Sequence, residues 1–223
     1  GWSVRENVGW ESPDQKQKKL KIGPLTNYFE IQRCFVNTSK TGKFLNLIAE
    51  DYTKSYYLLS PANTGKSTLL NNASLNVYKN NNGVRSYVIR IDKKIPTYEG
   101  LLDYLKKYHY VEDENFICIF DTMEYISSNL PDPKLLEELI QSLRNNHHVV
   151  WGASRPWEEF QFTETWRKFI EGNFVICNLP GLLSGTDIEK FKPKYEEFFS
   201  DEKEMLKFWK LILKEGEIES DSF

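Results

Sequence analysis

The sequence has little of what a secreted or membrane-spanning protein needs. Its 223 residues include three cysteines, Cys34, Cys118 and Cys177, which are odd in number and far apart. This spacing predicts neither a disulfide framework nor a zinc site. No apolar run approaches the ~18 residues of a membrane span, and no signal-peptide pattern opens the chain. We therefore expect a soluble intracellular protein, in the cytoplasm or nucleus, with no membrane partner.

The sequence also lacks an excess of charge of one sign. Lys and Arg number 29 against 32 Asp and Glu, which gives a formal net charge of −3. This balance provides no whole-surface attraction to a phosphate backbone, so nucleic acid is not indicated as a partner. Aromatic residues, in contrast, are abundant, with 14 Phe, 12 Tyr and 6 Trp. Such a composition predicts a chain that folds around an apolar core.

The chain divides into three predicted parts. Residues 1–24 are polar, include a QKQKK run, and are interpreted as an arm or linker. Residues 25–180 are expected to form one α/β domain, and residues 181–223 a small helical appendage. Because the sequence begins at Gly1 and ends soon after a predicted helix, it is compatible with a piece of a longer protein whose last subdomain is truncated.

Within the central part, short apolar segments alternate with segments of helical periodicity. Alternation of this kind, with continuously apolar strands, predicts a parallel sheet covered on both faces. The predicted strands are residues 55–59, 84–91, 116–120, 149–153 and 174–177, and the predicted helices include residues 66–78, 98–108, 134–144 and one that Ser39 caps.

Residues 60–67, SPANTGKS, match the phosphate-binding pattern G-x-x-x-x-G-K-[ST], except that Ser60 replaces the first glycine. A predicted strand precedes the segment and a predicted helix follows it, so amides at the helix start can point into the loop. In such a loop Gly65 lets the backbone approach the phosphates closely, and the positive charge of Lys66 interacts with the β and γ phosphates. The Ser67 hydroxyl binds Mg²⁺. The alternative is an ordinary strand-turn-helix with an incidental Gly-Lys-Ser.

A second acid is expected near the metal, at the end of a buried strand. Asp121 follows the apolar run FICIF and is the candidate, although an apolar run that ends in Asp can also be purely structural. The next residue is Thr122, and the nearest further acid is Glu124. If the backbone turns sharply after the strand, Glu124 could orient the attacking water; otherwise it is a solvated residue in a first helical turn.

The following strand ends in WGASRPW, where Ser154 and Arg155 leave the sheet beside Asp121. A cation there could sense the γ phosphate. Alternatively, Arg155 pairs with a surface carboxylate and Trp157 only packs. His109, His147 and His148 are assigned no chemistry, the last two being interpreted as edge positions. The aromatic residues of the appendage, Phe191 to Trp209, are interpreted as its own small core.

These motifs together resemble the additional-strand division of P-loop NTPases, and within it the AAA+ and STAND ATPases. The likeness spans about residues 34–191 and includes FVNTSKTGKFLNLI, SYVIRID followed by YEGLLDYL, ASRPW and LPGLLSGTDIEKF. It implies a three-layer αβα sandwich with a five-stranded parallel sheet of order 5-1-4-3-2. It also implies that residues 181–223 form a C-terminal helical lid.

The resemblance further implies a ligand, ATP in preference to GTP, with Mg²⁺. Ser67 and Asp121 are the expected metal ligands, and Lys66, Asp121, Glu124 and Arg155 the expected catalytic residues. The expected nucleotide-binding residues are Ser60, Pro61, Ala62, Asn63, Thr64, Gly65, Lys66, Ser67, Thr68 and Ser154, with Phe35 and Val36 near the adenine.

Two functions follow as hypotheses. The first is an ATPase module whose hydrolysis drives or switches a larger protein, with other domains or proteins as partners and a homo-oligomer left open. The second is a nucleotide-dependent interaction module with little or no hydrolysis. A small-molecule phosphotransferase lacks a recognisable acceptor pocket in the sequence, and a DNA motor lacks a basic stripe.

Overall fold

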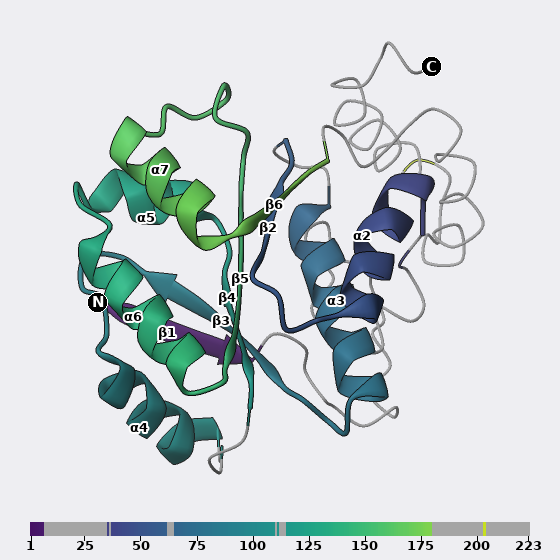
Figure 1. Ribbon diagram of the computed structural model, residues 1–223, viewed down its shortest axis with the longest axis horizontal. Helices are drawn as coiled ribbons and strands as arrows, with labels where there is room; N and C mark the ends of the chain where they lie inside the picture. Colours follow the sequence, from purple (N-terminus) through teal and green to yellow (C-terminus); the bar gives the residue numbers. More distant parts are fainter. Residues whose placement is uncertain are drawn as a thin grey trace.

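In the described part of the chain, the sheet has six strands, of which five are parallel. The computed structural model describes residues 1–6, 35, 37–61, 65–109, 111, 115–179 and 203, and the following statements concern these residues. The strands are β1 (Trp2–Glu6), β2 (Tyr56–Leu59), β3 (Ser86–Ile91), β4 (Ile117–Phe120), β5 (Val149–Ser154) and β6 (Val175–Asn178). Their order is β1-β3-β4-β5-β2-β6 (Figure 1).

The five parallel strands, β6-β2-β5-β4-β3, have the order predicted from the sequence. The predicted count of five strands is wrong, because β1 pairs antiparallel with β3 at the sheet edge, from Trp2 opposite Ile91 to Glu6 opposite Tyr87. The interpretation of residues 1–24 as an arm is therefore wrong for residues 2–6. Residues 7–24 lie outside the described part of the chain.

Helices cover both faces of the sheet, and each face has its own core. The helices are α2 (Ser39–Glu50), α3 (Lys66–Asn80), α4 (Tyr98–His109), α5 (Met123–Asn129), α6 (Lys134–Asn145) and α7 (Glu164–Asn173). Helices α2 and α3 lie on one side of the sheet and α4 to α7 on the other (Figure 1). Successive strand residues alternate between these cores: Tyr56 and Leu58 belong to one, and Tyr57 and Leu59 to the other.

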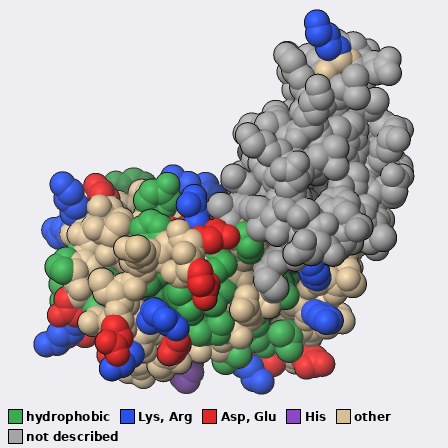
Figure 2. Space-filling view, turned by 90° about the horizontal axis from the view of Figure 1, so that it is seen from above, with side chains coloured by type: hydrophobic (Ala, Val, Ile, Leu, Met, Phe, Trp, Pro, Cys, Tyr) green, Lys and Arg blue, Asp and Glu red, His purple; other side chains and the backbone are tan. Residues whose placement is uncertain are grey.

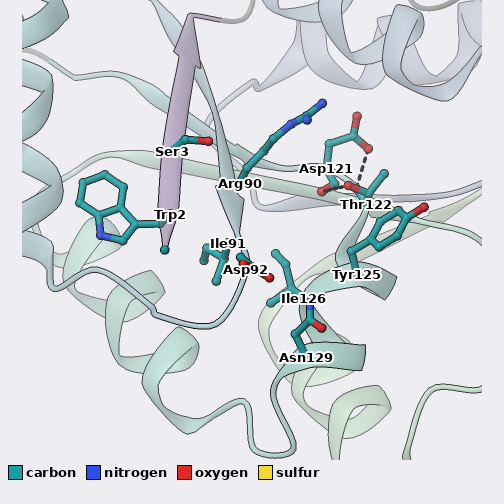
Figure 3. A pocket seen from close by; sticks show the side chains of 11 residues that line it. Trp2, Ser3, Arg90, Ile91, Asp92, Asp121, Thr122, Tyr125, Ile126 and Asn129 are labelled. Carbon is teal, nitrogen blue, oxygen red and sulfur yellow. Dashed lines mark hydrogen bonds between the residues drawn. The ribbon is translucent and has the colours of Figure 1, made fainter.

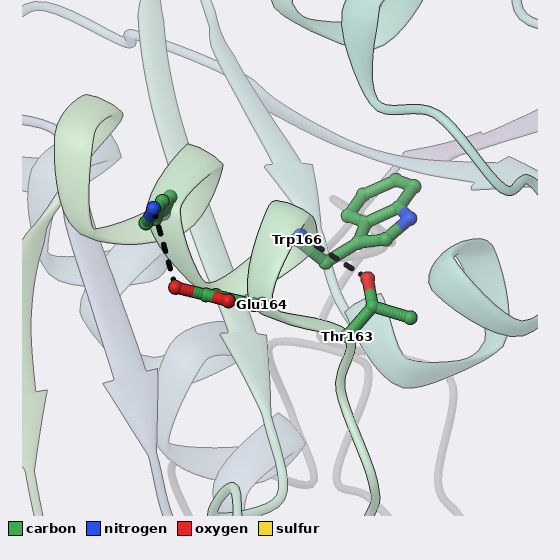
Figure 4. A network of polar contacts seen from close by, with 4 residues as sticks. Thr163, Glu164 and Trp166 are labelled. Carbon is green, nitrogen blue, oxygen red and sulfur yellow. Dashed lines mark hydrogen bonds and ion pairs between the residues drawn. The ribbon is translucent and has the colours of Figure 1, made fainter.

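The helix ends follow from short polar signals in the sequence. Thr38, not the predicted Ser39, caps α2 in a capping box: the Thr38 hydroxyl accepts the Thr41 N–H, and the Thr41 hydroxyl accepts the Thr38 N–H. At α7, the Thr163 hydroxyl accepts the Trp166 N–H at 3.3 Å, and Glu164 forms an ion pair with Lys168 one turn later (Figure 4). These two caps fix where α2 and α7 begin.

The predicted lid, residues 181–223, lies outside the described residues except for Lys203. Within the described ranges, no helix combines the length and apolar character required to cross a membrane. On the face shown in Figure 2, basic and acidic side chains of the described part are interspersed rather than gathered by sign.

Candidate nucleotide site

The phosphate-loop segment connects β2 to α3, as the sequence predicts. Ser60 is fully buried after β2, and its backbone N–H donates to the Ser154 carbonyl of β5 at 3.2 Å. Ser60 is not among the residues with positive φ, so this position does not require glycine. Gly65, the N-cap of α3, has φ 87° and ψ 20°, the left-handed conformation that glycine favours. The departure from the consensus thus falls where serine fits.

Lys66 is the first residue of α3 and is only 8% exposed. Its ammonium group donates a hydrogen bond to the Ser60 carbonyl at 3.1 Å. Burial lowers the pKa of Lys66, while the nearby carboxylates of Glu124 and Asp121 oppose this shift. A buried cation therefore lies against the Ser60 carbonyl and near two acids.

Ser67 and Asp121, 54 residues apart in the sequence, are in direct contact. The Ser67 hydroxyl donates to Asp121 Oδ2 at 2.6 Å, and Asp121 Oδ1 accepts the Thr122 N–H at 2.8 Å. Parallel strands bring their carboxyl ends to one edge of the sheet, so the residue after β4 meets the start of the helix after β2. The structure thus brings together the two residues predicted to bind a metal ion.

Glu124 is buried, 3% exposed, in the first turn of α5. The backbone turns sharply at Thr122, which has φ 55° and ψ 50°. Glu124 Oε2 accepts the Arg155 N–H at 2.8 Å. Burial raises the pKa of Glu124, and the Arg155 N–H and the Lys66 charge partly offset this rise. The alternative that Glu124 is a solvated helix residue is therefore wrong.

Ser154 is the last residue of β5, and Arg155 follows it beside this cluster. Ser154 is fully buried, and its hydroxyl donates to the Arg155 carbonyl at 2.9 Å. Arg155 forms no ion pair with a described carboxylate, and its charge lies close enough to Lys66 to lower the lysine pKa. Trp157 packs, stacking on Tyr57 with ring centroids 6.2 Å apart.

The roles of the predicted nucleotide-binding residues stay predictions. Ala62, Asn63, Thr64 and Val36 lie outside the described residues. Phe35 is partly buried and packs against the core between the sheet and α2–α3. Its contact with adenine stays a prediction.

His148 differs from its prediction as an edge position. It is 7% exposed, its ring stacks on Phe116 with centroids 3.8 Å apart, and the Tyr98 hydroxyl lies 3.1 Å from Nε2. Burial lowers the pKa of His148 to about 4. It precedes β5, whereas the candidate site lies where that strand ends.

Sequence reasoning missed Arg90 and Arg5. Val88 of β3 pairs with Ile119 of β4, and continuing this parallel register by two residues sets Arg90 beside Asp121. The signal that could have found Arg90 was its charge near the end of the otherwise largely apolar segment SYVIRI. Arg5 could not be found, because no pattern in residues 1–24 predicted a strand.

No protein-family model matches the sequence, and no curated protein matches it. Among solved structures, a DNA replication initiation factor is similar at 14% identity and a TM-score of 0.53, over 86% of this chain and 62% of that one. The fold is that of the additional-strand P-loop NTPases. The predicted likeness to the AAA+ group is confirmed at the level of the fold.

Two other solved structures are similar with TM-scores below 0.5. DnaA from Aquifex aeolicus, solved with AMPPCP, has 15% identity and a TM-score of 0.49, over 78% of this chain and 57% of that one. C. elegans PCH-2 has 13% identity and a TM-score of 0.48, over 73% of this chain and 51% of that one. The chain thus spans less than two thirds of the length of each of these three proteins.

Proposed function

We propose that this chain binds ATP with Mg²⁺ between β2 and α3 and hydrolyses it. The observation that carries the proposal is the Ser67 hydroxyl at 2.6 Å from the Asp121 carboxylate, directly after a buried lysine at a helix start. A hydroxyl and a carboxylate are hard oxygen donors, which suit Mg²⁺. Lys66 and the amides at the start of α3, where no side chain caps the helix, would hold the phosphates.

Hydrolysis requires a residue that orients water, and Glu124 is our candidate. Its carboxylate is fixed by the Arg155 N–H at 2.8 Å, and its raised pKa makes it a better proton acceptor than an ordinary glutamate. The Arg155 guanidinium, at the end of β5, would stabilise negative charge that develops on the transferring phosphoryl group. Bound Mg²⁺ would supply further charge neutralisation on the phosphates.

A second candidate function is a nucleotide-dependent switch with little hydrolysis. The residue directly after Asp121 is Thr122, whose hydroxyl donates to the Asp121 carbonyl at 2.6 Å. This side chain is engaged locally and provides no carboxylate for a water molecule. On either function, the module would drive or switch a larger intracellular protein, with other domains, protein partners or further copies of itself.

The decisive experiment is a binding titration with Mg·ATP, with GTP in parallel, on the parent chain and on Lys66→Ala. We expect Lys66→Ala to weaken binding about tenfold or more, because it removes a charge-assisted contact to phosphate. Lys54→Ala is the matched control, since Lys54 is exposed and precedes β2 at the opposite end of the strand. Equal affinities for the parent and Lys66→Ala would refute the site, and phosphate release by the parent separates the two functions.

A further inference from the structure

A pocket of ≈ 750 Å³ opens beside Asp121, on the side of β3 and β1 (Figure 3). Its volume lies within the range of small-molecule sites. Its residues come from the start of β1, the end of β3, the turn after β4 and helix α5. They are Gly1, Trp2, Ser3, Arg90, Ile91, Asp92, Asp121, Thr122, Tyr125, Ile126 and Asn129.

The added strand β1 brings a second arginine close to this pocket. Ser3 pairs with Arg90, and Arg5 pairs with Val88, so the antiparallel register sets Arg5 and Arg90 on the same face of the sheet. Burial lowers the pKa of Arg5, the charge of Arg90 lowers it further, and the charge of Asp121 opposes that shift. In Figure 3 the guanidinium of Arg90 points to the same side as the Asp121 carboxylate.

Several polar side chains of the pocket are uncommitted. Arg90, Asp92, Tyr125 and Asn129 are exposed, and their side chains form no hydrogen bond or ion pair with another described residue. Tyr125, on helix α5, is 62% exposed. One guanidinium, the carboxylates of Asp92 and Asp121, an amide and an exposed aromatic ring thus line one cavity.

We propose that this pocket binds a small organic phosphate ester that carries a ring and hydroxyl groups. Arg90 binds the phosphoryl oxygens, for which a planar guanidinium is well suited. Tyr125 stacks on the ring, and Asp92 and Asn129 bind hydroxyls. Asp121 faces both this pocket and the nucleotide site, so the phosphate ester would lie next to the metal ion proposed above. The pocket itself does not depend on nucleotide binding.

The test uses phenyl phosphate as the probe, titrated into the whole chain by calorimetry and followed by NMR shifts of Tyr125 and Asn129. We expect binding of phenyl phosphate and none of phenol, which lacks the anion. Arg90→Gln should weaken binding about tenfold or more, and Tyr125→Ala roughly fivefold. Arg85→Gln is the matched control, because Arg85 is exposed just before β3, at the other end of that strand.

Two further arms separate this pocket from the nucleotide site. Lys66→Ala should retain phenyl phosphate binding, and a non-hydrolysable ATP analogue should not displace the probe. Displacement by the analogue, equal affinities of Arg90→Gln and Arg85→Gln, or no binding by the parent would overturn the proposal. A parent that binds phenyl phosphate but not ATP would refute the proposed function and leave this site standing.

Discussion

At the scale of single residues, the backbone of Thr122 decides what the site can do. A threonine with φ 55° is unusual, because β-branched residues rarely occupy the left-handed region. Strained backbone of this kind is often found at functional sites. Here the turn takes the chain from Asp121 to Glu124 so that both carboxyl groups lie near Lys66.

Glu124→Gln tests the catalytic role of the buried acid. Glutamine keeps an oxygen that can accept the Arg155 N–H, but it cannot take a proton from water. We expect ATP affinity to stay near that of the parent and phosphate release to fall about 10² to 10⁴-fold. Both quantities are measured on one preparation, with exposed Glu138→Gln as the control. Turnover at the parental rate would place the base elsewhere.

Glu124 should also leave a signature in the pH dependence of stability. Burial raises its pKa above the ordinary 4.5, so the folded chain binds a proton at higher pH than the unfolded chain. The stability that this proton uptake contributes is fully present at pH values below the ordinary pKa. It is lost as pH rises through the raised pKa of the folded chain. Relative to Glu124→Gln, the free energy of unfolding of the parent should therefore fall over that window, by about 1.4 kcal/mol for each unit of pKa shift.

Denaturant titrations at a series of pH values from about 4 to about 8 measure this difference. Glu138→Gln again serves as the control, and its difference from the parent should not change in the same way. A parent that gains stability relative to Glu124→Gln across this range would show that the pKa of Glu124 is not raised.

The sequence predicted Lys66, Ser67 and Asp121 because their chemistry depends on local spacing and on a strand on either side. It could not predict the environment of Glu124, since the group that fixes its carboxylate is the Arg155 N–H, 31 residues away. The burial of Lys66 and His148 was missed for the same reason. The exposure of a side chain depends on which residues pack around it in the folded chain. A single sequence does not give the distances between residues that are far apart along the chain.

At the scale of elements, the parallel strands were predictable and β1 was not. Strands buried on both faces read as continuous apolar runs, such as YYLL and ICIF. Strand β1, WSVRE, is half polar because only Trp2 and Val4 pack on the core, and Arg5 faces the other side. Helix α7 was also missed, and α5, only seven residues long, entered the sequence interpretation only as one alternative for Glu124.

The cap of α2 offers a direct comparison between sequence and structure. The sequence interpretation gave this role to Ser39, whereas the structure gives it to Thr38. Thr38→Ala should lower the free energy of unfolding by about 1 kcal/mol, the usual cost of losing an N-cap. Ser39→Ala, at an exposed neighbouring position, should change it by less than about 0.5 kcal/mol. Chemical denaturation of both variants measures these two losses of stability. A larger loss for Ser39→Ala than for Thr38→Ala would restore Ser39 as the cap.

At the scale of the whole molecule, the predicted site lies at the carboxyl ends of the parallel strands, in a sheet that separates two cores. Its residues come from β2 and α3, from the end of β4 and the start of α5, and from the end of β5. A ligand that contacts all of these elements would link parts of the chain that are far apart in sequence. Nucleotide binding should therefore be visible as a change in global stability.

We expect Mg·ATP to raise the melting temperature. A ligand that binds only the folded chain stabilises it by about 2.7 kcal/mol at a hundredfold excess over Kd. For a chain of this size, that corresponds to roughly 5 to 10 °C. Removing Mg²⁺ with a chelator should reduce the shift, because the Ser67–Asp121 pair would lose its metal ion. Lys66→Ala should also reduce it, whereas Lys54→Ala should not. If neither ATP nor GTP shifts the melting temperature of the parent, the pairing of Ser67 with Asp121 has a structural role alone.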